Sequence, residues 1–179
     1  MPEIVLLFIG MFALRITSLI ISVRNERRLK AEGAVEYGKG NTILLSAAHF
    51  FFYFGSLTEA LIRERSIVEY TYLGLGIWIL SMVMLVLVIR GLGPLWTVKL
   101  IIAPKHKVQT NWLFKNIKHP NYYLNIIPEL IGVVFVFQAW WVLCIGFPIY
   151  LIPLFRRIMQ EEAVMREKLQ DYVNLHRKQ

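Results

Sequence analysis

The chain has 179 residues, of which 56% are hydrophobic, with a mean hydropathy of +0.52 and a formal net charge of +8. This length suffices for one domain, the hydropathy lies outside the usual soluble range, and the basic residues cluster between long apolar runs. The pattern indicates an integral membrane protein and argues against a nucleic-acid binder. Neither the single cysteine, Cys144, nor the four histidines have metal-ligand spacing, so we expect no metal site and no disulfide framework.

The apolar runs predict an all-α integral membrane protein, a single domain over residues 1–179 with about five transmembrane helices. The predicted spans are residues 3–23, 41–62, 70–89, 121–138 and 140–155. The last two are nearly continuous, and we place a tight turn between them at residues 138–141.

The distribution of lysine and arginine predicts the orientation of the chain in the membrane. Seventeen of these residues fall in segments 24–40, 90–119 and 156–179, whereas only two fall between the second and third spans. Because basic residues accumulate on the cytoplasmic side, we expect the N-terminus outside and the C-terminus in the cytoplasm. No basic residue precedes Arg15, so we expect no cleaved signal peptide.

The three basic segments have different patterns. Segment 24–40 mixes charges and ends in glycines, which predicts a short helix lying on the membrane surface. Segment 91–119 is broken by glycine and proline and predicts a re-entrant or interfacial segment, with a short strand over 97–102. Segment 156–179 is polar with helical periodicity and predicts an amphipathic helix.

A few residues within the first three spans have more than one interpretation. Arg15 either extends its charge to the interface or pairs with a carboxylate, and His49 is either a packed histidine or a functional one. Gly74 and Gly76 in the third span would allow close contact between helices.

Residues 115–129 combine basic, polar and apolar positions at the start of the fourth span. Pro120 suits the first turn of a helix, where free backbone N–H groups bind carboxylates. Asn125 and Glu129 are four residues apart and therefore share one face of a helix. A carboxylate such as Glu129 inside a span is a functional-site hypothesis by default. The alternative is a basic membrane boundary followed by a proline that starts a helix.

A second group of charged residues follows the last span. Arg157 and Glu161 are four residues apart, and Glu162 comes next. Taken alone, this pattern is also typical of a solvated helix with a surface ion pair.

The two groups together resemble a known family. His119-Pro120-Asn121-Tyr122 before one span and Arg157-x-x-x-Glu161-Glu162 after the next are similar to motifs of the isoprenylcysteine carboxyl methyltransferases, integral membrane enzymes that use S-adenosylmethionine. Segments 25–38 and 96–99 extend the resemblance, which covers about residues 24–172. The chain is most similar to a bacterial branch that includes enzymes that O-methylate long-chain phenolic or pyrone lipids.

The resemblance implies roles for individual residues. It places the cofactor at His119, Pro120, Asn121, Tyr122 and Glu162, and implicates Arg157 and Glu161 in catalysis or substrate orientation. It also implies that residues 91–179 form the cofactor-binding part, with a pocket on the cytoplasmic side of a membrane, by analogy a bacterial plasma membrane.

The methyl acceptor is expected to be a lipophilic small molecule that enters from the membrane lipids. A phenol is mostly protonated at neutral pH and benefits from a general base, for which Glu129 is favoured over His49 and His119. A prenylcysteine carboxylate is already ionised and needs no base. A non-enzymatic multi-pass membrane protein is the alternative from another functional class.

Overall fold

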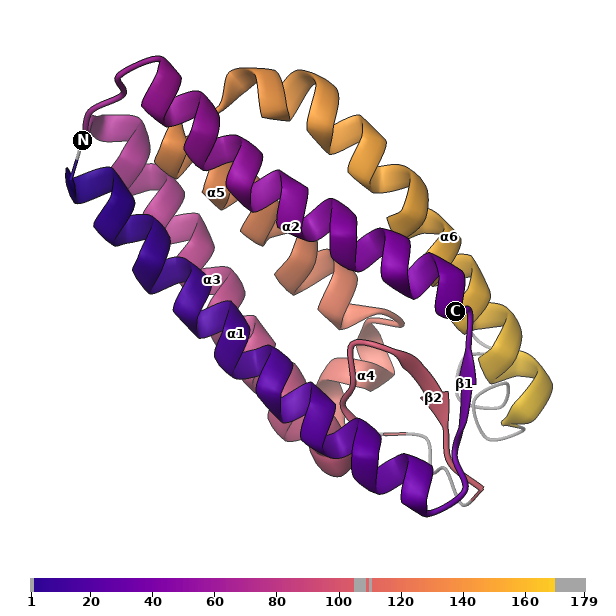
Figure 1. The fold of residues 1–179 in the computed structure, drawn as a ribbon. Helices are drawn as coiled ribbons and strands as arrows, with labels where there is room; N and C mark the ends of the chain where they lie inside the picture. The colour runs from indigo at the N-terminus through magenta and orange to yellow at the C-terminus, as the bar shows by residue number, and fades with distance from the viewer. Residues whose placement is uncertain (1, 105–108, 110, 170–179) are drawn as a thin grey trace.

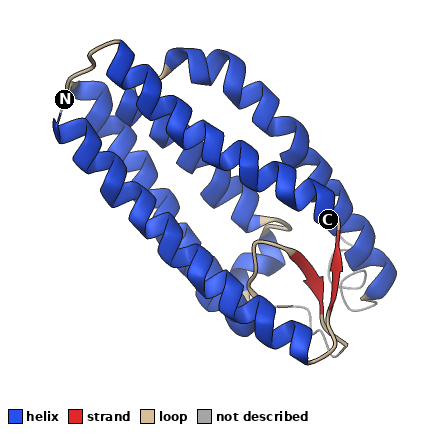
Figure 2. Cartoon of the chain, in the orientation of Figure 1, coloured by secondary structure: helices blue, strands red, loops and turns tan. Residues whose placement is uncertain are grey.

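The computed structural model describes residues 2–104, 109 and 111–169. Long helices lie side by side, with a two-stranded sheet at one end of the bundle, which we call the sheet end (Figures 1 and 2). The longer helices are α1 (Pro2–Ala31), α2 (Lys39–Ile62), α3 (Glu69–Leu92), α5 (Ile127–Phe137) and α6 (Phe147–Lys168). The short elements are β1 (Val35–Tyr37), η1 (Gly93–Leu95), β2 (Leu100–Ile102), α4 (Trp112–Asn116), η2 (Asn121–Ile126) and η3 (Val142–Gly146).

The predicted all-α membrane fold is confirmed. Among the described residues, four helices are long and apolar enough to cross a membrane: α1, α2, α3 with η1, and η3 with α6. The fourth predicted span is a shorter apolar helix formed by η2 and α5, Asn121–Phe137. Most of α5 is buried among the other helices, so little of its surface would meet lipid.

The predicted surface helix in segment 24–40 is wrong. Helix α1 continues without a break to Ala31, because the charged residues after the apolar run are good helix formers that keep their side chains in water. The chain then turns at Gly33, whose φ is +85°, and enters β1.

The predicted strand over 97–102 is confirmed in part, as β2. It pairs antiparallel with β1, with Val35 opposite Ile102 and Tyr37 opposite Leu100. Lys99 Nζ lies 2.6 Å from the Glu26 carboxylate, which ties the segment before β2 to the end of α1. The sheet therefore joins two segments that are about 65 residues apart in the chain.

The predicted polar helix after the last span is a continuation of α6 rather than a separate element. It remains helical to Lys168, and residues 170–179 lie outside the described part of the chain. The predicted turn between the last two spans is confirmed, because Gln138 ends α5 with a φ of +50°.

Helices α3 and α5 cross at two glycines. A Cβ atom added to Gly74 would lie 2.4 Å from the backbone nitrogen of Val136 and 2.7 Å from the carbonyl oxygen of Gly132. A Cβ atom added to Gly76 would meet nothing within 4 Å. Gly74 therefore has the predicted role in close helix contact, and Gly76 does not.

Two widened helical turns precede prolines at matching positions. The π-helical segments η2 and η3 end at Ile126 and Gly146, and Pro128 and Pro148 follow two residues later. Proline has no N–H to donate and its ring collides with the carbonyl four residues earlier, so the preceding turn widens. The first of these turns contains Tyr122 and Asn125.

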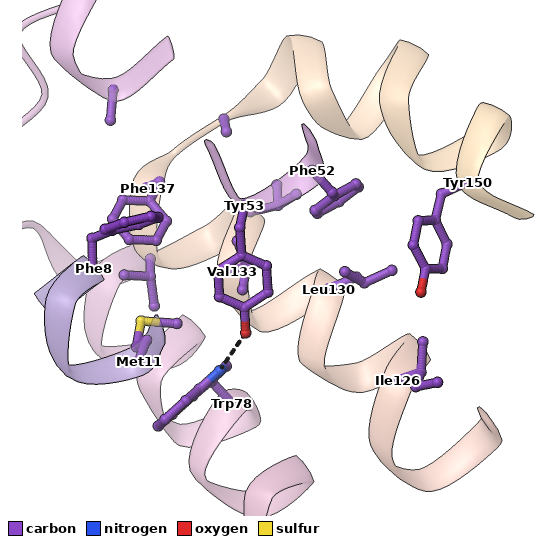
Figure 3. Close-up of a cluster of buried hydrophobic side chains, with 14 of the residues drawn as sticks. Phe8, Met11, Phe52, Tyr53, Trp78, Ile126, Leu130, Val133, Phe137 and Tyr150 are labelled. Atoms are coloured by element: carbon purple, nitrogen blue, oxygen red, sulfur yellow. Dashed lines mark hydrogen bonds between the residues drawn. The ribbon is translucent and has the colours of Figure 1, made fainter. Parts of the chain in front are cut away.

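The core lies among α1, α2, α3, α5 and α6 and is rich in aromatic residues. Phe8 packs against Tyr53 and Phe137, with ring centroids 6.5 and 6.0 Å apart. Figure 3 shows Tyr53 extending from α2 so that its hydroxyl meets the indole of Trp78 on α3, at 3.2 Å. Polar groups thus enter the middle of an otherwise apolar core.

Candidate functional site

One cluster of polar side chains lies near the sheet end, where the segment before η2 meets α6. The His119 ring contacts both glutamates, with Nδ1 3.2 Å from Glu161 Oε1 and Nε2 3.4 Å from Glu162 Oε2. The Tyr122 hydroxyl donates to Glu161 Oε2. We call His119, Tyr122, Glu161 and Glu162 the glutamate cluster.

The neighbours of the buried His119 ring favour its protonated form. Burial alone would lower the pKa of His119, but the hydrogen bond to Glu161 and the charges of Glu161 and Glu162 outweigh it, so the pKa is raised. Protonated imidazole has two N–H groups, one for each glutamate. In its protonated form, His119 would bridge the two carboxylates of the cluster.

Arg157 lies beside this cluster and is almost completely buried, at 2% exposure. Its guanidinium donates to Thr42 Oγ1 at 2.9 Å and to the carbonyl oxygen of Val98 at 2.7 Å. These contacts connect α6 to the start of α2 and to the segment before β2. Arg157 also interacts with the Tyr122 hydroxyl and with the charge of Glu161, as a buried cation at the junction of three segments rather than as part of a surface ion pair.

A cavity of about 800 Å³ opens on the Glu162 side of the cluster. Both signs of charge line it: Glu162 and Glu167 on one hand, and Lys118 and Arg166 on the other. His119, Ile158, Met159 and Ala163 complete the lining. Its volume lies within the range of small-molecule sites.

A second polar cluster surrounds Glu129 in the middle of the bundle. Glu129 is completely buried, and its Oε1 lies 2.9 Å from Arg15 Nε in an ion pair and accepts the Tyr53 hydroxyl. Among the described residues, Glu129 Oε2 has no hydrogen-bond donor. We call Arg15, His49, Tyr53 and Glu129 the midspan cluster.

The midspan cluster extends to α6 through His49. Its Nε2 lies 3.3 Å from Arg15 Nε and 3.6 Å from Glu129 Oε1, and its Nδ1 lies 3.1 Å from the Tyr150 hydroxyl. Figure 3 shows Tyr150 entering from the α6 side, with Leu130 between it and Tyr53. Arg15 thus has the carboxylate partner that was one of its two interpretations, and His49 has polar partners on three helices.

The structure brings most of the sequence-predicted residues together and leaves one apart. His119, Tyr122, Glu161 and Glu162 form one cluster, with Pro120 and Asn121 in the turn between the first two and Arg157 beside it. Glu129 belongs to the other cluster. Its position is ten residues beyond His119, roughly 15 Å along a helix. Tyr122, Asn125 and Glu129 nevertheless share one face, at spacings of three and four residues.

Several residues in these clusters are missing from the sequence prediction. Tyr53, Trp78 and Tyr150 are polar-tipped aromatics inside apolar spans, a pattern too common to single them out. Thr42, the partner of Arg157, is a lone hydroxyl near the start of a span. Lys118 and Arg166 look like any basic residues at a membrane boundary.

Comparison with known proteins gives the family. Residues 73–167 match the model of the isoprenylcysteine carboxyl methyltransferase (ICMT) family, which is more than half of the chain. The chain belongs to the ICMT family. The matched segment of this ICMT-family protein contains the whole glutamate cluster together with Arg157 and Glu129, whereas Arg15, His49 and Tyr53 lie before it.

Two relatives of this ICMT-family protein cover most of its length. A Haemophilus influenzae protein described as uncharacterized is 47% identical over 158 residues, which cover 88% of this chain and 92% of the relative. The Bacillus subtilis protein YpbQ, also described as uncharacterized, is 25% identical over 154 residues, covering 86% and 90%. No solved structure matches the chain. Family and fold together make it a multi-pass membrane protein of a methyltransferase family.

Proposed function

We propose that this protein is a methyltransferase that uses S-adenosylmethionine and acts on a lipophilic acceptor at the cytoplasmic side of the membrane. The observation that carries the proposal is the cavity of about 800 Å³ beside the glutamate cluster, which has both signs of charge at its wall. We assign residues 91–179 as the cofactor-binding part and a bacterial plasma membrane as the location, both from the resemblance.

The residues at the cavity fit the groups of the cofactor. S-adenosylmethionine supplies an electrophilic methyl group on a sulfonium, and it also has an ammonium and a carboxylate. Glu162 would bind a cationic group, and Lys118 or Arg166 the carboxylate. Tyr122 and His119 hold the Glu161 carboxylate in place from two sides.

The turn that begins η2 adds a second way to hold an anion. Pro120 starts the helix, and the backbone N–H groups in the first turn of a helix favour a carboxylate. Asn121 lies in that turn, next to Tyr122. We therefore keep Pro120, Asn121 and Tyr122 as cofactor-binding residues together with His119 and Glu162.

The acceptor that we favour is a long-chain phenolic or pyrone lipid, methylated on oxygen. Such an acceptor has a proton to lose, and Glu129 remains the proposed general base because its Oε2 has no donor among the described residues. Arg157 and Glu161 are proposed to orient the acceptor. Carboxyl methylation of a prenylcysteine-like substrate is the second candidate, favoured by the function in the name of the matched family.

Cofactor binding by purified protein tests the proposal directly. Glu162→Gln removes one anionic partner of the cofactor and His119→Ala removes the bridge between the glutamates, so both should weaken S-adenosylmethionine binding in calorimetry. Glu32→Gln, an exposed change at the end of α1, is the matched control and should bind as wild type does. Unchanged affinity in both folded variants would remove the cofactor assignment and favour a non-enzymatic membrane protein.

Lipid profiling identifies the acceptor class. Cells with and without the protein are supplied with a labelled methyl donor, and their lipids are compared by mass spectrometry. We expect label on a long-chain phenol or pyrone in cells that contain the protein. Label only on a prenylated cysteine would favour the second candidate.

A further inference from the structure

The Glu129 carboxylate is bonded through only one of its two oxygens. Oε1 is ion-paired with Arg15 and accepts the Tyr53 hydroxyl, whereas Oε2 is buried and has no donor among the described residues. An unsatisfied buried acceptor is unfavourable by roughly 1–3 kcal/mol, and more when it is charged. Arg15 on α1 and His49 and Tyr53 on α2 position this carboxylate, so its free oxygen has a fixed direction.

A second free acceptor lies one helical turn closer to the glutamate cluster. Asn125 is 1% exposed, and its amide nitrogen donates to Asn121 Oδ1 at 3.1 Å. Its own Oδ1 is buried and has no donor among the described residues. Because Asn125 and Glu129 are four residues apart, both free oxygens belong to the helix face that begins with Tyr122.

Such a pair of oxygens selects the chemistry of a ligand. Both can accept a hydrogen bond and neither can donate one, so a neutral hydroxyl group satisfies them. A carboxylate would place a third set of acceptor oxygens against them, without a donor between. The only cation of the midspan cluster with a fixed charge, Arg15, is already ion-paired with Glu129, and its Nε donates to His49 Nε2.

We propose that Asn125 and Glu129 form a recognition site for the hydroxyl group of a lipid acceptor, positioned by Arg15 and Tyr53 from α1 and α2. This inference rests on the proposed function, because it assigns the methyl acceptor to hydroxyl-bearing lipids rather than to lipid carboxylates. It also assigns acceptor recognition partly to α1 and α2, whose positioning residues precede the segment that matches the family. The site binds the acceptor whether or not Glu129 also takes a proton.

Binding without turnover tests the site. The ligands are a 1,3-dihydroxybenzene with a fifteen-carbon chain, its dimethyl ether, and a fatty acid of matched chain length, titrated into the full chain in nanodiscs without a methyl donor. Only the dihydroxy compound can donate a hydrogen bond to the charged carboxylate, so we expect it to bind at least about tenfold tighter than the ether. The fatty acid should bind no tighter than the ether.

The variants separate the site from its surroundings. Glu129→Gln leaves Arg15 without its anionic partner and can misfold, so the paired change Arg15→Gln with Glu129→Gln removes both charges, and Asn125→Ala leaves the ion pair intact. Both should reduce the preference for the dihydroxy compound over the ether by about threefold or more. Glu69→Gln, an exposed glutamate at the start of α3, should retain the full preference.

Three outcomes would overturn the inference: equal binding of the diol and the ether, a preference that both folded variants retain, or tighter binding of the fatty acid that depends on Arg15. The last result would identify an anion site instead. Failure of the proposed function is a different result, because a protein that binds the diol selectively but transfers no methyl group keeps the site and loses the enzyme. A protein that methylates a phenol but does not bind the diol selectively keeps the proposed function and loses the site.

Discussion

The crossing of α3 and α5 makes a prediction whose size follows from three distances. In Gly74→Ala, the new Cβ atom would lie 2.4 Å from Val136 N, 2.7 Å from the Gly132 carbonyl oxygen and 2.8 Å from Phe135 Cβ. Two of these neighbours are backbone atoms of α5, which cannot rotate away as a flexible side chain can. The helices must therefore separate by about 1 Å to reach ordinary van der Waals contact near 3.5 Å.

The expected change in stability is the sum of two opposing effects. Overpacking a well-packed interface is unfavourable by about 1–3 kcal/mol, and the backbone contacts place this case in the upper part of the range. Replacing glycine by alanine within a helix is favourable by about 0.5–1 kcal/mol. We expect Gly74→Ala to lower the free energy of unfolding by about 1–2 kcal/mol.

Gly76 provides a matched control on the same helix. A Cβ atom there meets nothing within 4 Å, so Gly76→Ala should gain only the helical effect and raise stability by about 0.5–1 kcal/mol. Thermal unfolding in detergent, followed by far-ultraviolet circular dichroism, should give a lower midpoint than wild type for Gly74→Ala and a higher one for Gly76→Ala. At about 2–4 °C per kcal/mol, the two variants should differ by several degrees. A Gly74→Ala protein as stable as wild type would refute the close crossing that positions the helix face of Tyr122, Asn125 and Glu129.

The remaining predictions concern protonation, catalysis and orientation. Because the pKa of His119 is raised, its bonds to the two glutamates should stabilise the protein fully below a pH of about 6.5 and progressively less as the pH rises through the folded-state pKa. Across this range, the thermal unfolding midpoint should fall for wild type and stay level for His119→Gln. Equal pH dependence of the two midpoints would contradict an imidazolium paired with the glutamates. Glu129→Gln should lower the methylation rate of a long-chain phenol by about 10²–10⁴-fold, and the loss should shrink as the pH rises because more of the acceptor is then ionised. A flat rate–pH profile, with turnover of a farnesylated cysteine analogue alone, would favour the carboxylate acceptor. Cysteines introduced at positions 33 and 107, with Cys144 replaced, should both be labelled from the cytoplasmic side, and labelling of either from the opposite side would contradict the predicted topology.

The sequence alone determined the class of protein and most of its helices. Long apolar runs have few other stable structures than membrane helices, since every backbone N–H and C=O group must be paired within the membrane, so the spans could be read from composition and length. The family could be recognised because His119-Pro120-Asn121-Tyr122 and the two glutamates are local patterns with a fixed spacing. Element boundaries were less certain: α1 and α6 continue into charged residues that favour a helix as strongly as the apolar run does.

Only the tertiary structure decided which charged side chains meet. Glu129, Arg15 and His49 lie on three different helices, and nothing in the period of any one helix records the crossing geometry that brings them together. The same holds for Arg157, whose spacing suggested Glu161 as its partner and which also donates to Thr42 and Val98, on segments distant in the chain. Pairings of this kind depend on how whole helices pack and on where Gly74 and Gly132 allow them to approach. A linear pattern specifies the face on which a residue lies, and the packing of helices specifies what that face contacts.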